Sequence, residues 1–395
     1  MTNSANWLIH HVNIVLEDRV AFGSVVVRNG EITELLIDNP ADPAAYAGDR
    51  EWSVIDGQNG YLLPGFIDVH IHGGYGADFM DATSDSFDTI TRFHASQGTT
   101  TMLATTMTAS KEAIEAVLAA VTEYRSTEMP YAALHGVHLE GPFISEKWSG
   151  AQNPAFIMAP QLEWMQQWEA RWPGLIKQLT LAPEKEGSLE TISWLAEQGI
   201  NTACGHTDAL YEEVIAAADA GLSQAVHTYN AMRGLHHREP GTLGAVLTDD
   251  RIAAELIADG IHVHPGAISL LLKAKPADKV ILITDAMAAA GMSDGEYELG
   301  GLAVIVKNGE ARLQEGNALA GSCLTMISAL RYIREHTNLP LEQLSKLASG
   351  NAAKQLGINS LTGNIANGKQ ADLVWTDEHL QIKQTWVKGR SVYEA

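Results

Sequence analysis

The 395-residue sequence has little positive charge and only two cysteines. Lysine and arginine together number 26, against 48 aspartates and glutamates, so the formal net charge is −22. Such an acidic chain argues against nucleic acid or an anionic membrane as a partner, because both attract basic surfaces. A small anionic substrate stays open, because one local arginine or lysine can hold it whatever the net charge.

Long apolar runs are also missing. No stretch of about 18 apolar residues predicts a transmembrane helix. The first twenty residues lack the basic start of a signal peptide, and His10, His11 and Asn13 interrupt their apolar stretch. The two cysteines, Cys204 and Cys323, are too few for a disulfide framework and fit a reducing compartment. We therefore expect a cytoplasmic protein.

The middle of the chain contains eight short apolar runs, each ending in polar or ionisable residues. These runs are Phe66–His72, Thr99–Thr106, Leu134–Pro142, Lys177–Glu184, Asn201–Asp208, Ser223–Asn230, Ile252–His262 and Lys279–Ala286. Apolar residues at three-to-four spacing predict helices between the runs, over Ser84–Gly98, Ser110–Ser126, Ser188–Ile200 and Tyr211–Gly221. This alternation predicts an α/β fold, a (β/α)8 TIM barrel with its chemistry at the carboxyl ends of the strands.

Both ends of the chain have a different texture. Residues 1–61 are rich in β-formers and broken by Asn-Gly and Asp-Gly, and residues 363–395 resume this pattern. We expect the two ends to form one small β-sandwich domain beside a barrel of residues 62–362. The alternative is that each end decorates the barrel independently.

The predicted strand ends carry the side chains of a hydrolytic metal site. His70 and His72 are two apart, so a strand places both imidazoles on one face. Glu140, His206 and His227 end the third, fifth and sixth runs, and these ends meet at the mouth of a barrel. Histidine nitrogens with a carboxylate oxygen and an open position are typical of catalytic zinc.

Asp285 ends the eighth run, and two roles fit it. A carboxylate beside an activated water can take its proton and pass it to the leaving group. Alternatively, it orients a metal-bound histidine.

The motifs PGFIDVHIHGG, HLEGPF, GHTDA, HTYNAM, REPG, ADGIH, TDAM and LAGS occur in this order. Over nearly the whole chain the sequence thereby resembles the N-acetylglucosamine-6-phosphate deacetylases of the amidohydrolase superfamily. PGFIDVHIH and the terminal GKQADLV are shared across that superfamily, whereas HLEGPF, HTYNAM with REPG, and TDAM together point to the deacetylases. The resemblance implies hydrolysis of a phosphorylated amino sugar to glucosamine 6-phosphate and acetate.

The resemblance also implies a metal centre. Glu140, His206 and His227 would be its principal ligands, with Asp285 as general base and acid. Some family members replace the paired histidines with amides and hold one metal ion. Because this chain keeps His70 and His72, one or two divalent ions per subunit are expected, with Glu140 as a bridge. Zn is the ion most expected, and Fe, Mn or Co also suit such ligands.

Further residues would then bind substrate. The resemblance implies that Arg238 holds the phosphate, reaching in from the neighbouring subunit of a homodimer. Where some members carry a substrate-contacting histidine, this chain has Gln152, so phosphate binding would depend more on Arg238. The other expected substrate-binding residues are Ala151, Asn230, Ala231 (through its backbone N–H), Asp259, Gly260, Ile261, His262, Leu319, Ala320 and Gly321.

Other activities remain as alternatives. A broader N-acetyl amino-sugar deacetylase shares every feature above except the phosphate requirement. A cyclic amide hydrolase often uses a barrel-end lysine as a bridging ligand, but Lys177 begins its run instead of ending it. A phosphosugar isomerase or aldolase would not need a histidine-rich site. A non-catalytic barrel scaffold would have lost ligands that are all present here.

Overall fold

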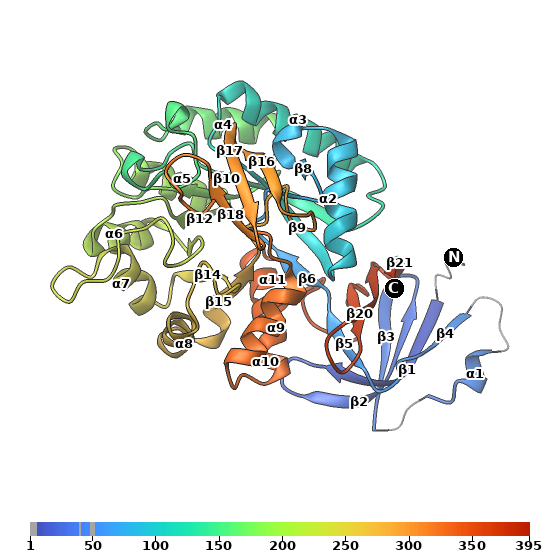
Figure 1. The fold of residues 1–395 in the computed structure, drawn as a ribbon. Coiled ribbons are helices and arrows are strands. Elements are labelled where there is room, and N and C mark those ends of the chain that lie inside the picture. Colours follow the sequence, from blue (N-terminus) through green and yellow to red (C-terminus); the bar gives the residue numbers. More distant parts are fainter. Residues whose placement is uncertain (1–5, 39–40, 48–51) are drawn as a thin grey trace.

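The computed structural model describes residues 6–38, 41–47 and 52–395. Figure 1 shows a barrel that carries helices around its outside and a separate sheet built from the two ends of the chain. Among the described residues, every helix is too short or too polar to cross a lipid bilayer.

Eight parallel strands form the barrel, and they neighbour one another in chain order. This arrangement confirms the expected (β/α)8 fold, because each predicted apolar run supplies one strand. The strands are β6 (Phe66–Asp68), β9 (Thr99–Thr106), β10 (Ala133–Glu140), β11 (Ile176–Leu181), β12 (Asn201–Cys204), β13 (Gln224–Ala225), β14 (Ala253–Ile257) and β15 (Val280–Ile283).

Polar contacts join the first and last barrel strands. Asp68 Oδ2 accepts a hydrogen bond of 2.6 Å from Thr284 Oγ1. The backbone N–H of Asp285 donates to the carbonyl of His70 at 2.9 Å. These bonds bring the segment that carries His70 and His72 beside the end of β15, so residues more than 200 positions apart share one site.

The helices cover the outside of the barrel with their apolar faces inward. Thr83 and Ser110 cap α2 and α3 by accepting hydrogen bonds from the backbone of the first turn. All four helices predicted from periodicity are present. The larger helices are α2 (Ser84–Ser96), α3 (Lys111–Ser126), α4 (Leu162–Arg171), α5 (Ser188–Glu197), α6 (Tyr211–Ala220), α7 (Gly241–Thr248), α8 (Pro265–Ala274) and α9 (Met326–His336), followed by the short α10 (Leu341–Ser345) and α11 (Asn351–Gln355).

The two ends of the chain share one eight-stranded sheet, as expected, and its blue and red strands lie together in Figure 1. Trp7 on β1 stacks on Trp386 on β20, with ring centroids 4.7 Å apart, although two strands separate them in the sheet. The sheet therefore folds over its own core, as in a sandwich. Its strands are β1 (Asn6–Val15), β2 (Val20–Arg28), β3 (Glu31–Ile37), β4 (Trp52–Asp56), β5 (Tyr61–Pro64), β19 (Leu373–Thr376), β20 (Ile382–Val387) and β21 (Arg390–Glu394). The domain limits at 61 and 363 stay a prediction.

An additional antiparallel sheet, which the sequence analysis did not predict, lies between β15 and α9. It contains β16 (Gly295–Leu299), β17 (Leu302–Lys307) and β18 (Glu310–Leu313). Its buried Leu299 and Val304 share a small core with Met107 and Met287 from the barrel loops. This packing holds the sheet over the carboxyl ends of the barrel strands.

Candidate active site

A cavity of about 410 Å³ opens at the carboxyl ends of the barrel strands. Its floor carries Glu140, His72 and Asp285, and the sheet β16–β18 contributes Leu299 and Arg312 to its wall. The expected residues that line it are His72, Glu140, Ala151, Gln152, His206, His227, Asn230, Ala231, His262, Asp285, Leu319 and Gly321. The position of the cavity is the one that the barrel fold predicts.

Glu140, the last residue of β10, is the centre of the histidine group. Its Oε1 lies 3.2 Å from Nε2 of His70, 3.2 Å from Nε2 of His206 and 3.1 Å from Nε2 of His227. Its Oε2 lies 3.2 Å from Nε2 of His72. All four imidazoles expected from the sequence therefore meet the same carboxylate.

His70 and His72 reach Glu140 from just beyond β6 and not from within it. The strand ends at Asp68, and the segment Val69–His72 that follows it is buried throughout. The strained backbone appears at later strand ends: His206 has a φ of 48°, His227 of 29° and Asp285 of 50°. Such left-handed conformations are uncommon for residues with a Cβ and concentrate at functional sites.

The histidines use their other ring nitrogen to bond the protein. Nδ1 of His206 donates to the carbonyl of Trp148 at 2.8 Å, and Nδ1 of His227 to that of Asn230 at 3.2 Å. Nδ1 of His72 lies 3.3 Å from the carbonyl of Thr105. A carbonyl only accepts, so Nδ1 carries a hydrogen in each ring, and Nε2 is the atom that faces the carboxylates.

A lone pair on Nε2 repels a carboxylate oxygen at these distances unless a proton or a metal ion lies between the two atoms. Nε2 of His70 is fully buried and has no hydrogen-bond partner of good geometry. One donor atom each from His70, Glu140 and His227 lies within 4.8 Å of the other two, and the same holds for His70, His72 and Asp285. This donor set fits a divalent metal ion, and it offers ligands for two.

The same charges shift the proton affinities of the site. Burial alone would lower the pKa of His72, but the carboxylates of Asp285 and Glu140 outweigh it and raise that pKa to about 10. Burial would raise the pKa of Glu140, but His70 and the other imidazoles hold it well below its usual range. The site thus strongly favours bound positive charge, whether protons or metal ions.

Asp285 stands between the histidine pair and the cavity. Its Oδ1 lies 3.2 Å from Nε2 of His72 and 3.6 Å from Nε2 of His70. Burial would raise the pKa of Asp285, but these two imidazoles lower it, so the side chain is a carboxylate at neutral pH. A carboxylate in this position can accept a proton from water at the cavity floor.

A buried glutamate that the sequence analysis missed supports His70. Oε2 of Glu255, on β14, lies 2.8 Å from Nδ1 of His70. Oε1 of Glu255 accepts hydrogen bonds from the amides of Gln178 at 2.9 Å and Gln224 at 2.5 Å. The available signal was a charged residue inside the otherwise apolar run Ala253–Ile257.

Some of the substrate residues predicted from the sequence line the cavity, and others lie outside its lining. Asp259 lies behind the cavity wall, where its Oδ2 is 2.6 Å from Nδ1 of His262 and so orients that ring. Gln152 donates to Oε2 of Glu140 at 2.5 Å, so its amide meets the metal-ligand group in this structure. Expected residues outside the cavity lining are His70, Arg238, Asp259, Gly260, Ile261 and Ala320.

Two cations that the sequence analysis did not name line the cavity. Lys147 bonds Oδ2 of Asp208 at 2.9 Å, and its side chain is 63% exposed. Arg312, on β18, donates to the carbonyl of Asn317 at 2.7 Å and pairs with Glu310. Arg238 instead lies on an exposed loop, where its Nη1 is 2.8 Å from Nε2 of His237. The positive charge along the cavity wall of this chain therefore comes from Lys147 and Arg312.

The sequence profile of the amidohydrolase family matches residues 61–392. The chain belongs to the amidohydrolase family. This amidohydrolase is 41% identical over 390 residues to N-acetylglucosamine-6-phosphate deacetylase of Bacillus subtilis, covering 98% of this chain and 97% of the relative. It is also 40% identical to N-acetylgalactosamine-6-phosphate deacetylase of Escherichia coli O157:H7, covering 83% of this chain and 87% of the relative.

This amidohydrolase is also similar to solved structures of N-acetylglucosamine-6-phosphate deacetylases over nearly its whole length. A mutant N-acetyl-D-glucosamine-6-phosphate deacetylase of Mycobacterium smegmatis, in complex with N-acetyl-D-glucosamine-6-phosphate, has a TM-score of 0.90 at 31% identity, covering 98% of this chain and 99% of that one. The Thermotoga maritima N-acetylglucosamine-6-phosphate deacetylase has a TM-score of 0.88 at 35% identity, covering 98% and 100%.

Proposed function

We propose that this amidohydrolase removes the acetyl group of N-acetylglucosamine 6-phosphate and releases acetate and glucosamine 6-phosphate. The observation that carries the proposal is the Glu140 centre with Asp285 beside it, at the floor of a cavity of about 410 Å³. The names of the relatives at 41% and 44% identity support the same reaction.

Two groups of side chains would hold metal. His206 and His227 with Glu140 would bind one divalent ion, and His70 and His72 would bind a second with Glu140 as a bridge. Zn is our first choice, with Fe, Mn and Co as alternatives, because imidazole and carboxylate ligands suit all four. When bound, such an ion supplies Lewis-acid polarisation of the acetyl carbonyl and lowers the pKa of water.

Asp285 would move the proton. Its carboxylate takes a proton from water as the oxygen attacks the acetyl carbon, and it later delivers that proton to the sugar nitrogen as the C–N bond breaks. His262, which Asp259 orients through Nδ1, would contact the sugar or the acetyl amide from the cavity wall. The C–O bond formed and the C–N bond broken give acetate and a free amine.

The phosphate would be bound from two directions. We propose that the active enzyme is a homodimer in which Arg238 of one subunit reaches the cavity of the other, where a guanidinium can form a bidentate pair with phosphate. Lys147 and Arg312 line the cavity of their own chain and would add positive charge. Asn230, Ala231, Ala151, Gln152 and the segment Leu319–Gly321 would contact the sugar and acetyl group.

One assay tests the proposal. Acetate release is measured from N-acetylglucosamine 6-phosphate, N-acetylgalactosamine 6-phosphate and unphosphorylated N-acetylglucosamine, with and without prior chelation. The proposal predicts chelator-sensitive activity that is highest on the first substrate. Preference for N-acetylgalactosamine 6-phosphate would change the assigned sugar to the one named for the 40%-identical relative. Equal rates with and without phosphate would indicate a broader deacetylase.

We place the reaction in the cytoplasm.

A further inference from the structure

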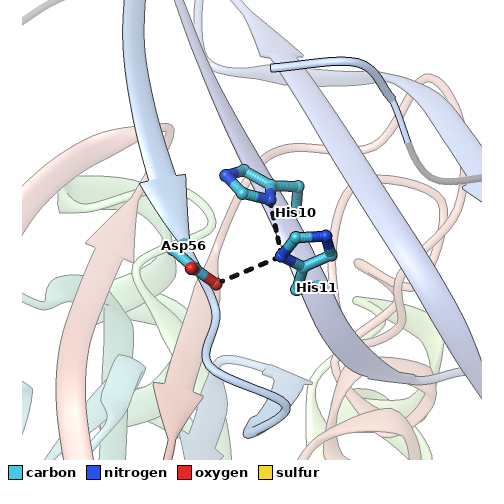
Figure 2. Close-up of side chains that lie close together, drawn as sticks. All are labelled: His10, His11 and Asp56. Carbon is cyan, nitrogen blue, oxygen red and sulfur yellow. Dashed lines mark hydrogen bonds and ion pairs between the residues drawn. The ribbon is translucent and has the colours of Figure 1, made fainter.

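The terminal sheet carries a second group of two imidazoles and a carboxylate, which shares no residue with the barrel centre. His10 and His11 lie on β1, and Asp56 ends β4 beside them (Figure 2). The Nδ1 atoms of His10 and His11 are 3.1 Å apart, and Nδ1 of His11 is 3.5 Å from Oδ1 of Asp56. One possible ligand atom from each residue lies within 4.8 Å of the others.

An irregularity in β1 brings the two rings together. Neighbouring residues on a regular strand point to opposite faces of the sheet. Here the pairing of β1 with β2 shifts register between Ile9 and Val12, and His11 has a left-handed φ of 51°. This bulge turns the two imidazoles toward one another. Bulges that re-aim a side chain are common beside functional sites.

The turn after Asp56 is held against the bulge. The backbone N–H of Gly57 donates to the carbonyl of His10 at 2.7 Å, and that of Asn59 to the carbonyl of His11 at 2.8 Å. A Cβ on Gly57 would lie 2.9 Å from the carbonyl oxygen of His10, so only glycine allows this approach. The three side chains therefore project from one backbone frame fixed by hydrogen bonds.

The distances match those between ligands of one small ion. Zinc binds imidazole nitrogen and carboxylate oxygen at about 2.0–2.2 Å, which places tetrahedral ligand atoms roughly 3.4 Å apart. The two separations of 3.1 Å and 3.5 Å lie on either side of this value. The side chains of His11 and Asp56 are 48% and 58% exposed, so an ion can enter and retain water.

We propose that His10, His11 and Asp56 form a second metal site, which binds one divalent transition-metal ion of the zinc, nickel or copper class. It is separate from the barrel centre and does not depend on the proposed deacetylase activity. Burial and then the neighbouring His11 lower the pKa of His10, which leaves that ring neutral, as a ligand must be. Since β1 pairs in parallel with β4 through His10 and Asp56, the ion ties these two strands together.

The competing account is a plain hydrogen bond between the two imidazoles. That bond requires neither Asp56 nor an ion, so removing the carboxylate separates the two accounts. His11→Asn removes one imidazole and preserves the backbone, because asparagine tolerates the left-handed conformation at this position. Asp56→Asn keeps an oxygen that can accept from the backbone N–H of Gln58, which Oδ1 now accepts at 3.0 Å.

The experiment uses the full chain without an affinity tag, after its barrel centre has been loaded with Zn²⁺. Protein is then titrated with Zn²⁺ and, separately, with one equivalent of Cu²⁺. Metal per chain is counted after gel filtration, and nitrogen hyperfine splitting is recorded by electron paramagnetic resonance. His379→Asn is the control, because His379 lies 3.6 Å from Glu378 on the same domain and has a side chain 78% exposed.

We expect wild type and His379→Asn to bind one more ion than either site variant, or to bind it at least tenfold more tightly. The Cu²⁺ spectrum should show two nitrogens in wild type and fewer in His11→Asn. Circular dichroism checks that each variant is folded, and Asp56→Asn decides the matter if His11→Asn is not. Equal metal content together with equal affinity in wild type and Asp56→Asn would overturn the proposal, as would an equal loss in His379→Asn.

Discussion

Nδ1 of His70 lies 2.8 Å from Oε2 of Glu255, and both side chains are fully buried beneath the candidate metal centre. The carboxylate holds a hydrogen of His70 on Nδ1, which leaves Nε2 facing Glu140 as the atom that a metal ion can bind. Partners of this kind orient a metal-binding imidazole and increase its basicity. Two glutamine amides occupy the other oxygen of Glu255, so an acidic side chain is required to accept on both sides.

Glu255→Gln should weaken metal binding at the histidine pair. An amide offers an acceptor on one side only, so either His70 or the two glutamines lose a buried hydrogen bond. We expect metal affinity to fall by about 10- to 100-fold and the free energy of unfolding by about 1–3 kcal/mol. Metal content and urea denaturation measure the two effects. Glu190→Gln, at an exposed helix position, is the control, and equal metal content in the two variants would contradict the role of Glu255.

Asp285→Asn should keep the metal and lose turnover. Asparagine has nearly the same shape but cannot take a proton, and general acid–base groups contribute about 10²- to 10⁴-fold to rate. The measurement is kcat for acetate release beside metal content in the same preparation. Loss of metal together with activity would show that Asp285 acts chiefly as a ligand or as an orienting group.

Chelation should lower both activity and thermal stability. Without a metal ion, the buried site loses the positive charge that offsets the carboxylates of Glu140 and Asp285. The ligand atoms of the four histidine rings also lose their shared partner. An ion present at about 100 times its Kd stabilises the folded state by about 2.7 kcal/mol. We therefore expect the Tm of chelated protein to fall by a few degrees and to recover on addition of Zn²⁺, whereas Mg²⁺, which prefers oxygen ligands, should not restore it. An unchanged Tm after verified metal removal would exclude a stabilising ion.

Arg238→Ala should damage use of the phosphorylated substrate selectively. Losing a bidentate charged hydrogen bond costs about 1.5–3 kcal/mol, or roughly 10- to 100-fold in kcat/KM. Activity on unphosphorylated N-acetylglucosamine is the internal control. Arg312→Ala tests the cation that lines the cavity of its own chain, and a larger loss there would move the main phosphate contact to β18.

Mixing two impaired variants, assayed on the phosphorylated substrate, tests whether Arg238 acts across a dimer. A dimer of one Arg238→Ala subunit and one Asp285→Asn subunit has one site with both residues intact, provided that Arg238 comes from the neighbour. If subunits exchange freely, half of the dimers are mixed, so about a quarter of wild-type activity should return. No recovery, with mixed dimers verified by mass spectrometry, would place Arg238 in the site of its own subunit.

Much of the barrel and its centre could be predicted from the sequence. The eight apolar runs became eight strands because a buried parallel strand requires a short, nearly continuous apolar segment. Residues at the ends of such strands must meet at one mouth of a closed barrel, whatever their separation in the chain. Glu140, His206, His227 and Asp285 were found by this rule, and the structure places their side chains together.

Only the tertiary structure decided the contacts that depend on side-chain direction and chain irregularity. The partner of His70 is 185 residues away, and its identity depends on which side chains turn inward at the same level of the barrel. The three strands of the sheet that carries Arg312 were not predicted from the sequence. The bulge that joins His10 to His11 breaks the very alternation by which strands are predicted. Periodicity therefore determined which segments would be buried, whereas closure of the barrel and local departures from regular geometry determined which polar atoms would meet.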